Sequence, residues 1–156
     1  MTAQRRPRCI FCAIAAGEAE AAVVLEDERF LAFLDHRPVF HGHALLIPRE
    51  HAGTLPDLPS GDAGPLLQRT QLLARAVPQA MAAEGSFVAI NNGVSQSVPH
   101  LHVHVVPRSR GDGLRGFFWP RHPYENASQL RETAERVRAA VDELRADEDG
   151  EPEARA

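Results

Sequence analysis

Residues 96–107 carry the most informative pattern in the chain and read Gln96-Ser97-Val98-Pro99-His100-Leu101-His102-Val103-His104-Val105-Val106-Pro107. Side chains on a β-strand alternate between its two faces. A strand over 101–106, together with the residue just before it, therefore places the three histidines on one face and the apolar residues on the other. The apolar face suits packing against a helix, and the row of imidazoles is available for chemistry.

Imidazole can serve here as a nucleophile or as a metal ligand. It attacks phosphorus when one ring nitrogen is unprotonated and the other is held by an acceptor such as a backbone carbonyl. His102, with a histidine on each side, is the best placed to be held in this way. Three histidines in line along a strand rarely converge on one ion, so the pattern favours a nucleophile over a pure metal site.

The rest of the chain predicts an α+β fold on an antiparallel sheet of about five strands with flanking helices. Pro78 should kink or limit the longer of the first two helices, and Gly85 should follow its end. The expected elements are a short helix ending near Gly17, strands over 23–26, 30–34, 44–47, 87–90 and 101–106, a loop over 55–65 and a helix over 66–83.

A C-terminal helix over about 127–146 is the clearest single element. Its apolar residues repeat at alternating spacings of four and three, which describes one helical face, and they are Leu130, Ala134, Val137, Val141 and Leu144. Asn126 can cap its start, with Gln129 three residues on. We expect a single domain over 9–146, preceded by a flexible arm over 1–8 and followed by an acidic, disordered tail over 147–156.

Composition excludes several function classes. The net charge is -4 and all 17 basic residues are arginine, with no basic stripe, which argues against a nucleic-acid partner. The absence of lysine rules out lysine chemistry. No apolar run approaches the roughly 18 residues of a membrane helix, and the N-terminus does not resemble a secretory signal, so we expect a cytoplasmic protein without a membrane partner.

Cys9 and Cys12 have the spacing of a zinc knuckle. A redox pair and two buried thiols are the alternatives. Redox pairs of this spacing usually precede a helix in a βαβ setting, which this sequence lacks.

The histidine segment fits the pattern His-φ-His-φ-His-φ-φ, where φ is apolar, and the chain resembles the histidine triad (HIT) family over about residues 8–108. Further ordered blocks carry the resemblance, including Asn91 and Gln96-Ser97 in the loop before the histidines. The other blocks are Cys9-Ile10-Phe11-Cys12 with Ile14, Leu31-Ala32-Phe33-Leu34-Asp35, and His43-Ala44-Leu45-Leu46-Ile47-Pro48-Arg49-Glu50-His51.

The resemblance implies a hydrolase that releases a nucleoside monophosphate, with AMP as the expected product, through a covalent nucleotidyl intermediate on His102. His104 would donate to the phosphate oxygens, and Asn91 would help to hold them. Gln96 and Ser97 would contact the phosphate or the leaving group. The resemblance also implies a homodimer with an extended sheet.

The nucleoside would be held by Asp35, whose carboxylate would accept the ribose hydroxyls. The base would lie in an apolar slot formed by Ile10, Phe11, Ile14 and Leu34. Taken alone, Asp35 reads better as a turn or cap residue, and the apolar residues read better as core. Only the joint order of the blocks favours the functional interpretation. His43 would orient the histidines from behind.

The resemblance further implies that His51 and His100 join Cys9 and Cys12 as ligands of a structural zinc ion. Two thiolates and two imidazoles form a closed tetrahedral site with no open position for water. His100 would then be committed to the metal and could not be the nucleophile.

The sequence departs from the family pattern in the loop before the histidines. Residues 92–95 are about two residues shorter than in eukaryotic members, and Ser95 stands where glycine is common. After the histidines, the basic and aromatic segment 111–121 either reads the leaving group, through Arg115, Trp119 or Arg121, or packs in the dimer.

Several functions remain open at this stage. The substrate is a phosphoramidate or a dinucleoside polyphosphate. The same histidine adduct could instead pass its nucleotide to phosphate or a sugar phosphate, as in a nucleotidyltransferase or phosphorylase. A nucleotide-binding regulatory protein with incidental turnover is the alternative outside the enzymes.

Overall fold

A computed structural model describes residues 9–114 and 121–150 of the chain, which fall into two units divided after Leu114. The second unit contains α3 (Ala127–Gly150). The elements of the first unit are α1 (Ile10–Ala15), β1 (Val23–Glu26), β2 (Phe30–Leu34), β3 (Ala44–Pro48), the 3-10 turn η1 (Leu55–Asp57), α2 (Ser60–Met81), β4 (Gly85–Ala89) and β5 (Val103–Arg108).

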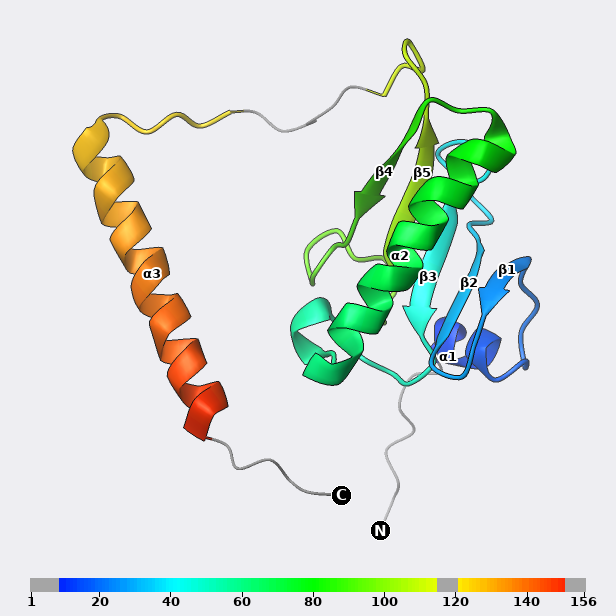
Figure 1. The fold of residues 1–156 in the computed structure, drawn as a ribbon, viewed down its shortest axis with the longest axis horizontal. Helices are drawn as coiled ribbons and strands as arrows, with labels where there is room; N and C mark the ends of the chain where they lie inside the picture. The colour runs from blue at the N-terminus through cyan, green and yellow to red at the C-terminus, as the bar shows by residue number, and fades with distance from the viewer. Residues whose placement is uncertain (1–8, 115–120, 151–156) are drawn as a thin grey trace. The chain divides into compact units, whose positions relative to one another are not determined.

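The strands form one five-stranded sheet in the order β1-β2-β3-β5-β4 (Figure 1). Every neighbouring pair is antiparallel. The predicted α+β fold, with an antiparallel sheet and flanking helices, is confirmed. Extension of the sheet in a homodimer stays a prediction.

The two faces of the sheet carry separate hydrophobic cores. On one face α2 packs Leu66 and Leu73 against Phe30, Leu46 and Val103, and Figure 1 shows this helix lying across the strands. On the other face α1 contributes Phe11 to a core completed by Leu31, Phe33, Leu45 and Ile47. Because β2 and β3 are covered on both sides, their sequences are apolar at nearly every position.

The long helix begins earlier than predicted. Residues 60–65 were expected to lie in a loop because they are rich in glycine and proline, yet α2 starts at Ser60. Asp62 lies in its first turn, where a carboxylate is favoured by the helix dipole, and forms a 2.6 Å ion pair with Arg29. Pro78 lies inside the last turn, and Ala82, in the left-handed region, ends the helix before Gly85.

The last strand begins later than predicted, which corrects the arrangement of the histidines. Strand pairing starts at Val103, so only His104 lies within β5, while His100 and His102 precede it. The backbone amide of Leu101 donates to Ala52 O (2.7 Å) instead of to a neighbouring strand. The three histidines therefore do not share one strand face, and His100 is free to turn toward a different set of partners.

Helix α3 matches the expected position and extends to Gly150, four residues past the expected end near 146. Its start is capped as predicted, since Asn126 Oδ1 accepts from the Gln129 amide (2.9 Å) and Gln129 Oε1 accepts from the Glu125 amide (2.7 Å). The apolar face of this helix is exposed. The expected arm over 1–8 and the end of the tail over 151–156 lie outside the described residues.

Neither α2 nor any other helix in the described ranges combines the length and apolar character required to span a membrane.

Candidate functional site

Four metal-binding side chains meet beside α1; we call them the metal cluster, and they are Cys9, Cys12, His51 and His100. The Sγ atom of Cys9 lies 3.3 Å from His100 Nδ1. The Sγ atom of Cys12 lies 3.3 Å from His51 Nδ1 and 3.5 Å from His100 Nδ1. These groups come from three segments that are far apart along the chain.

The metal cluster fits a tetrahedral ion. Zinc-ligand distances near 2.3 Å for sulfur and 2.0 Å for nitrogen give a sulfur-nitrogen edge of about 3.5 Å, close to the distances observed here. His100 Nε2 donates to Pro48 O (2.8 Å), which leaves its Nδ1 unprotonated and facing the sulfurs. Burial, with Cys9 beside it, raises the pKa of the Cys12 thiol to about 11, and a bound cation would favour its thiolate.

A second group lies next to the first and consists of Asp35, His43, His102 and His104; we call it the reaction cluster. The ring centroids of His102 and His104 are 4.9 Å apart. His102 Nδ1 lies 2.7 Å from the carbonyl oxygen of His100, so this nitrogen must be the protonated donor. The Nε2 atom of His102 therefore carries a lone pair, as a nucleophile requires.

His102 is held firmly as well as in one tautomer. Its ring packs against Phe11 with centroids 5.2 Å apart in an edge-to-face arrangement. Only 3% of its surface is exposed, so a substrate can approach only an edge of the ring.

The tautomer of His104 is set by a chain of hydrogen bonds. The backbone amide of Val39, which can only donate, lies 3.1 Å from His43 Nδ1. The proton of neutral His43 is therefore on Nε2, which lies 3.0 Å from His104 Nδ1 and donates to it. His104 must then carry its proton on Nε2 and presents an N–H donor.

The imidazole rings of His43 and His104 are both neutral. Burial lowers the pKa of His43, and the nearby His102 adds to this while Asp35 opposes it. Burial likewise lowers the pKa of His104 to about 4, helped by His102 and His43. Asp35, His43 and His104 also lie close enough to hold a cation. Because both nitrogens of His43 are already hydrogen-bonded, the arrangement is a donor relay instead of a ligand set.

Asp35 makes a turn contact and also lies beside His43. Its Oδ1 accepts from the Arg37 amide (2.9 Å), which is a turn contact. Its Oδ2 lies 3.8 Å from His43 Nδ1, so the carboxylate also reaches the reaction cluster. With 17% of its side chain exposed, it retains an accessible acceptor oxygen.

The loop before His102 is fixed by side-chain amides. Gln96 Nε2 donates to Gly53 O (2.7 Å), and Gln96 Oε1 accepts from the Gly93 amide (2.8 Å). Asn91 is half-buried just beyond β4, and Ser97 is exposed. Ser95 has a φ of 60°, in the left-handed region that favours the glycine typical of this position.

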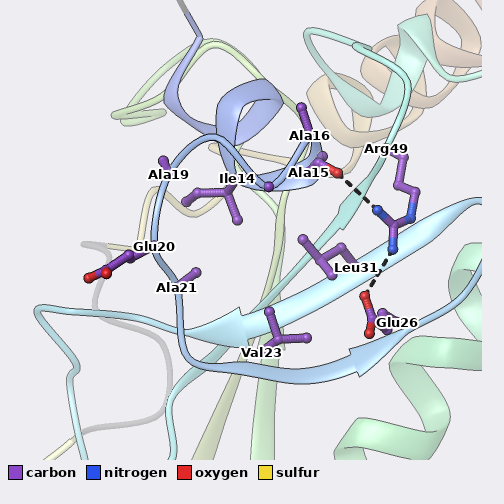
Figure 2. A pocket seen from close by; sticks show the side chains of 11 residues that line it. Ile14, Ala15, Ala16, Ala19, Glu20, Ala21, Val23, Glu26, Leu31 and Arg49 are labelled. Atoms are coloured by element: carbon purple, nitrogen blue, oxygen red, sulfur yellow. Dashed lines mark hydrogen bonds and ion pairs between the residues drawn. The ribbon is translucent and has the colours of Figure 1, made fainter.

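The residues expected to form the apolar slot are only partly brought together. Ile10 is exposed, Phe11 is buried, and Ile14 lines a pocket of about 410 Å³ together with Val23 and Leu31 (Figure 2). Leu34 pairs with Ala44 and belongs to the opposite face of the sheet, the one covered by α2.

Sequence reasoning missed Phe33, Arg49 and Asn92. Phe33 lies on the α1 face with its ring 5.4 Å from Phe11, and counting the strand alternation backward from Asp35 would have found it. Arg49 holds the end of α1 by donating to Ala15 O (2.9 Å) and to Glu26 (3.2 Å), as Figure 2 shows. Asn92 Oδ1 accepts from the Leu55 amide (2.8 Å), and nothing local in the sequence indicates this contact.

The segment predicted to read the leaving group lies mostly outside the described residues. Arg115 and Trp119 fall in the undescribed range 115–120. Arg121 is described and exposed, in the second unit.

Comparison with known proteins places this geometry in a family. Residues 16–111 match the HIT domain. An uncharacterised HIT-like protein of Mycobacterium tuberculosis is 39% identical over 140 residues, covering 85% of this chain and 97% of that protein. The adenosine 5'-monophosphoramidase hnt1 of Schizosaccharomyces pombe is 36% identical over 117 residues, covering 74% of this chain and 85% of the relative.

A solved structure agrees with both the fold and the family. The crystal structure of a Zn-bound histidine triad family protein from Mycobacterium smegmatis superimposes with a TM-score of 0.66 at 39% identity, covering 85% of this chain and 97% of that one. The sequence match, the superposition and the two histidine clusters agree: the chain belongs to the HIT family.

Proposed function

We propose that this protein is a nucleotide hydrolase that releases AMP from a phosphoramidate or a dinucleoside polyphosphate. The observation that carries the proposal is the pair of fixed tautomers in the reaction cluster. His102 presents a lone pair at Nε2, and beside it His104 presents an N–H donor. A nucleophile next to a donor is the arrangement that attack on a phosphate needs.

In the proposed reaction, His102 Nε2 attacks the α-phosphorus and forms a P–N bond while the bond to the leaving group breaks. The imidazole then carries a positive charge with its proton on Nδ1, and the His100 carbonyl oxygen stabilises that proton at 2.7 Å. The leaving group takes up a proton either from water or from Ser97, which then recovers a proton from the water molecule that attacks in the second step. Water then attacks the phosphorus, which releases AMP and restores neutral His102.

Neighbouring residues hold the substrate. His104 donates from Nε2 to a non-bridging phosphate oxygen, and Asn91 supports the same oxygens. Neutral His104 suits this role because its proton is held by the relay from Val39 through His43. Asp35 accepts from the ribose hydroxyls. Ile10, Ile14 and Phe33 line the base side, with Phe11 beneath them.

Zinc is the metal we propose for the metal cluster. The two sulfurs and two imidazole nitrogens form the ligand set that zinc prefers in closed structural sites. When bound, zinc would supply cross-linking of α1 to the sheet and no Lewis acid chemistry, because all four positions are taken. The Zn-bound relative from Mycobacterium smegmatis supports this choice.

We also propose a homodimer formed through β4 in the cytoplasm. β4 is an edge strand, and Val88 on it is 41% exposed. Leu67 on the neighbouring helix α2 is 68% exposed and lines a shallow pocket with Val88. An exposed apolar strand edge is a ready surface for pairing with another chain. Val88→Lys should shift the mass measured by light scattering from dimer to monomer, whereas a monomeric wild type would contradict the proposal.

The deciding experiment follows AMP release by chromatography from an adenosine phosphoramidate and from diadenosine tetraphosphate. We expect release by the wild type and by the control His36→Ala, whose side chain is exposed, and none by His102→Ala. Equal release by wild type and His102→Ala would overturn the proposed nucleophile. Formation of a nucleoside diphosphate on adding phosphate would show a phosphorylase instead of a hydrolase.

A further inference from the structure

Two segments that flank the reaction cluster are joined by hydrogen bonds, two of which involve side-chain amides. The segment 52–55 follows the metal-cluster residue His51, and the segment 92–101 leads to His102. Three hydrogen bonds join them: Leu55 N to Asn92 Oδ1 (2.8 Å), Gln96 Nε2 to Gly53 O (2.7 Å) and Leu101 N to Ala52 O (2.7 Å). A fourth, from the Gly93 amide to Gln96 Oε1 (2.8 Å), closes the loop on itself.

Within the loop, two backbone bonds add to these contacts, from Val94 N to Asn92 O (3.0 Å) and from Gln96 N to Gly93 O (3.4 Å). Val94 at its tip is 85% exposed, so it provides no apolar anchor. Gly93 and Ser95 both have positive φ angles, 80° and 60°, and the second is unfavourable for a residue with a side chain. A loop with this backbone and an exposed tip depends on its hydrogen bonds to keep one conformation.

The two amides are used differently, and this makes their roles separable. Gln96 uses its oxygen as an acceptor and one N–H as a donor, so the amide cannot rotate by 180° without losing both contacts. Asn92 uses its Oδ1 as an acceptor from the Leu55 amide. An aspartate at position 92 could keep its contact, whereas a glutamate at position 96 would turn an oxygen toward Gly53 O.

We infer that Asn92 and Gln96 are positioning residues, which clamp the loop 91–97 against the segment after His51 and thereby place Asn91 and Ser97 beside His102. The inference rests on the proposed hydrolase for its catalytic consequence, but the clamp itself exists without substrate. Gln96 therefore acts chiefly through the loop, and Asn92 gains a role that its exposed position does not suggest.

The test combines amide hydrogen exchange in the substrate-free protein, measured by NMR, with steady-state kinetics, using the full chain with zinc supplied. In Asn92→Ala the Leu55 amide should exchange about fivefold faster, and kcat should fall by about the same factor with KM less affected. Asn92→Asp should restore slow exchange at Leu55. In Gln96→Glu, repulsion between the carboxylate and Gly53 O should displace the side chain from the Gly93 amide, so this amide should exchange faster and kcat should fall. The control Gln79→Glu, exposed on α2, should change neither.

Two outcomes would overturn the inference. If kcat falls in Gln96→Glu and Asn92→Ala while exchange at Gly93 and Leu55 stays at the wild-type rate, these residues act by touching the substrate. If exchange accelerates but kcat does not change, the clamp does not serve the reaction. A wild type that releases no AMP would refute the proposed hydrolase, and the exchange rates would still show whether the clamp exists.

Discussion

His100 and His102 are two residues apart, yet the structure turns their rings toward different partners. His100 turns Nδ1 toward the sulfurs of Cys9 and Cys12, and its Nε2 is bonded to Pro48 O. His102 turns Nδ1 toward the carbonyl of His100, and its Nε2 has no hydrogen bond to any residue that the structure describes. In the function we propose, the backbone partner of each ring decides which nitrogen stays available, at His100 for a metal ion and at His102 for a phosphate.

The two clusters are linked through one residue, His100. The carbonyl that holds the tautomer of His102 belongs to His100, whose ring lies in the metal cluster. His100 therefore contributes its ring to the metal cluster and its backbone carbonyl to the reaction cluster.

The largest effect is expected from replacing His102 and His100 by alanine, one at a time. His102→Ala should lower the rate of AMP release by at least about a thousandfold, because the nucleophile is lost, while zinc content stays near one ion per chain. His100→Ala should lose zinc. We would measure zinc by atomic emission and AMP by chromatography on the same preparations. Full zinc occupancy in His100→Ala would break the assignment of the metal cluster.

Removal of the metal should have the next largest effect, and mainly on stability. Structural zinc contributes to folding directly, so Cys12→Ser should lower the free energy of unfolding by at least about 3 kcal/mol. Urea unfolding with and without a chelator measures this. A chelator should destabilise the wild type and His102→Ala equally, since His102 is not a ligand. If the chelator leaves the unfolding free energy of the wild type unchanged, no metal stabilises the fold.

The stability of the protein should depend on pH through His104 in the reaction cluster. Burial, with His102 and His43 nearby, lowers the pKa of His104 to about 4 in the folded state, from 6.5 when unfolded. The unfolded chain therefore binds a proton between these values that the folded chain does not. Stability from this group is complete above pH 6.5 and falls as the pH drops toward 4, by up to about 3 kcal/mol.

The comparison that tests this is between wild type and His104→Asn, unfolded in urea at pH 7 and pH 5. The variant keeps a polar side chain but cannot take up the proton, so its loss of stability between the two pH values should be smaller. His43 and His102 lie against the ring, and Asp35 also acts on it. An identical pH dependence in the two proteins would assign the effect to these neighbours instead of His104.

The sequence was sufficient to predict the α+β fold and the strands β1 to β3, because their apolar runs are uninterrupted and their ends are marked by turns. It was not sufficient for β5. Pattern alone placed His100 and His102 on a strand, but the bond from Leu101 N to Ala52 O is long-range and delays the strand to Val103. Composition misled at α2, where glycine and proline concealed the first turns.

For the site, the family resemblance supplied the residue set, and the tautomers came only from the structure. The relay from Val39 through His43 to His104 depends on a backbone amide that no sequence pattern identifies. The clamp by Asn92 and Gln96 is of the same kind, since its partners are backbone groups near Gly53. Strand parity, by contrast, was readable in advance and would have selected Phe33 over Leu34.

The smallest effect is expected in the shortened loop that serves the reaction cluster. Ser95 has a φ of 60°, a conformation that costs a residue with a side chain about 1 kcal/mol. Ser95→Gly relieves this strain but makes the unfolded chain more flexible, so the net change in unfolding free energy should lie within about 1 kcal/mol of zero. Ser95→Val, with a branched side chain, should instead destabilise and slow AMP release while leaving zinc content unchanged. If Ser95→Val lost zinc, the loop and the metal cluster would be one cooperative unit, and the separation of tasks between His100 and His102 would fail at this point.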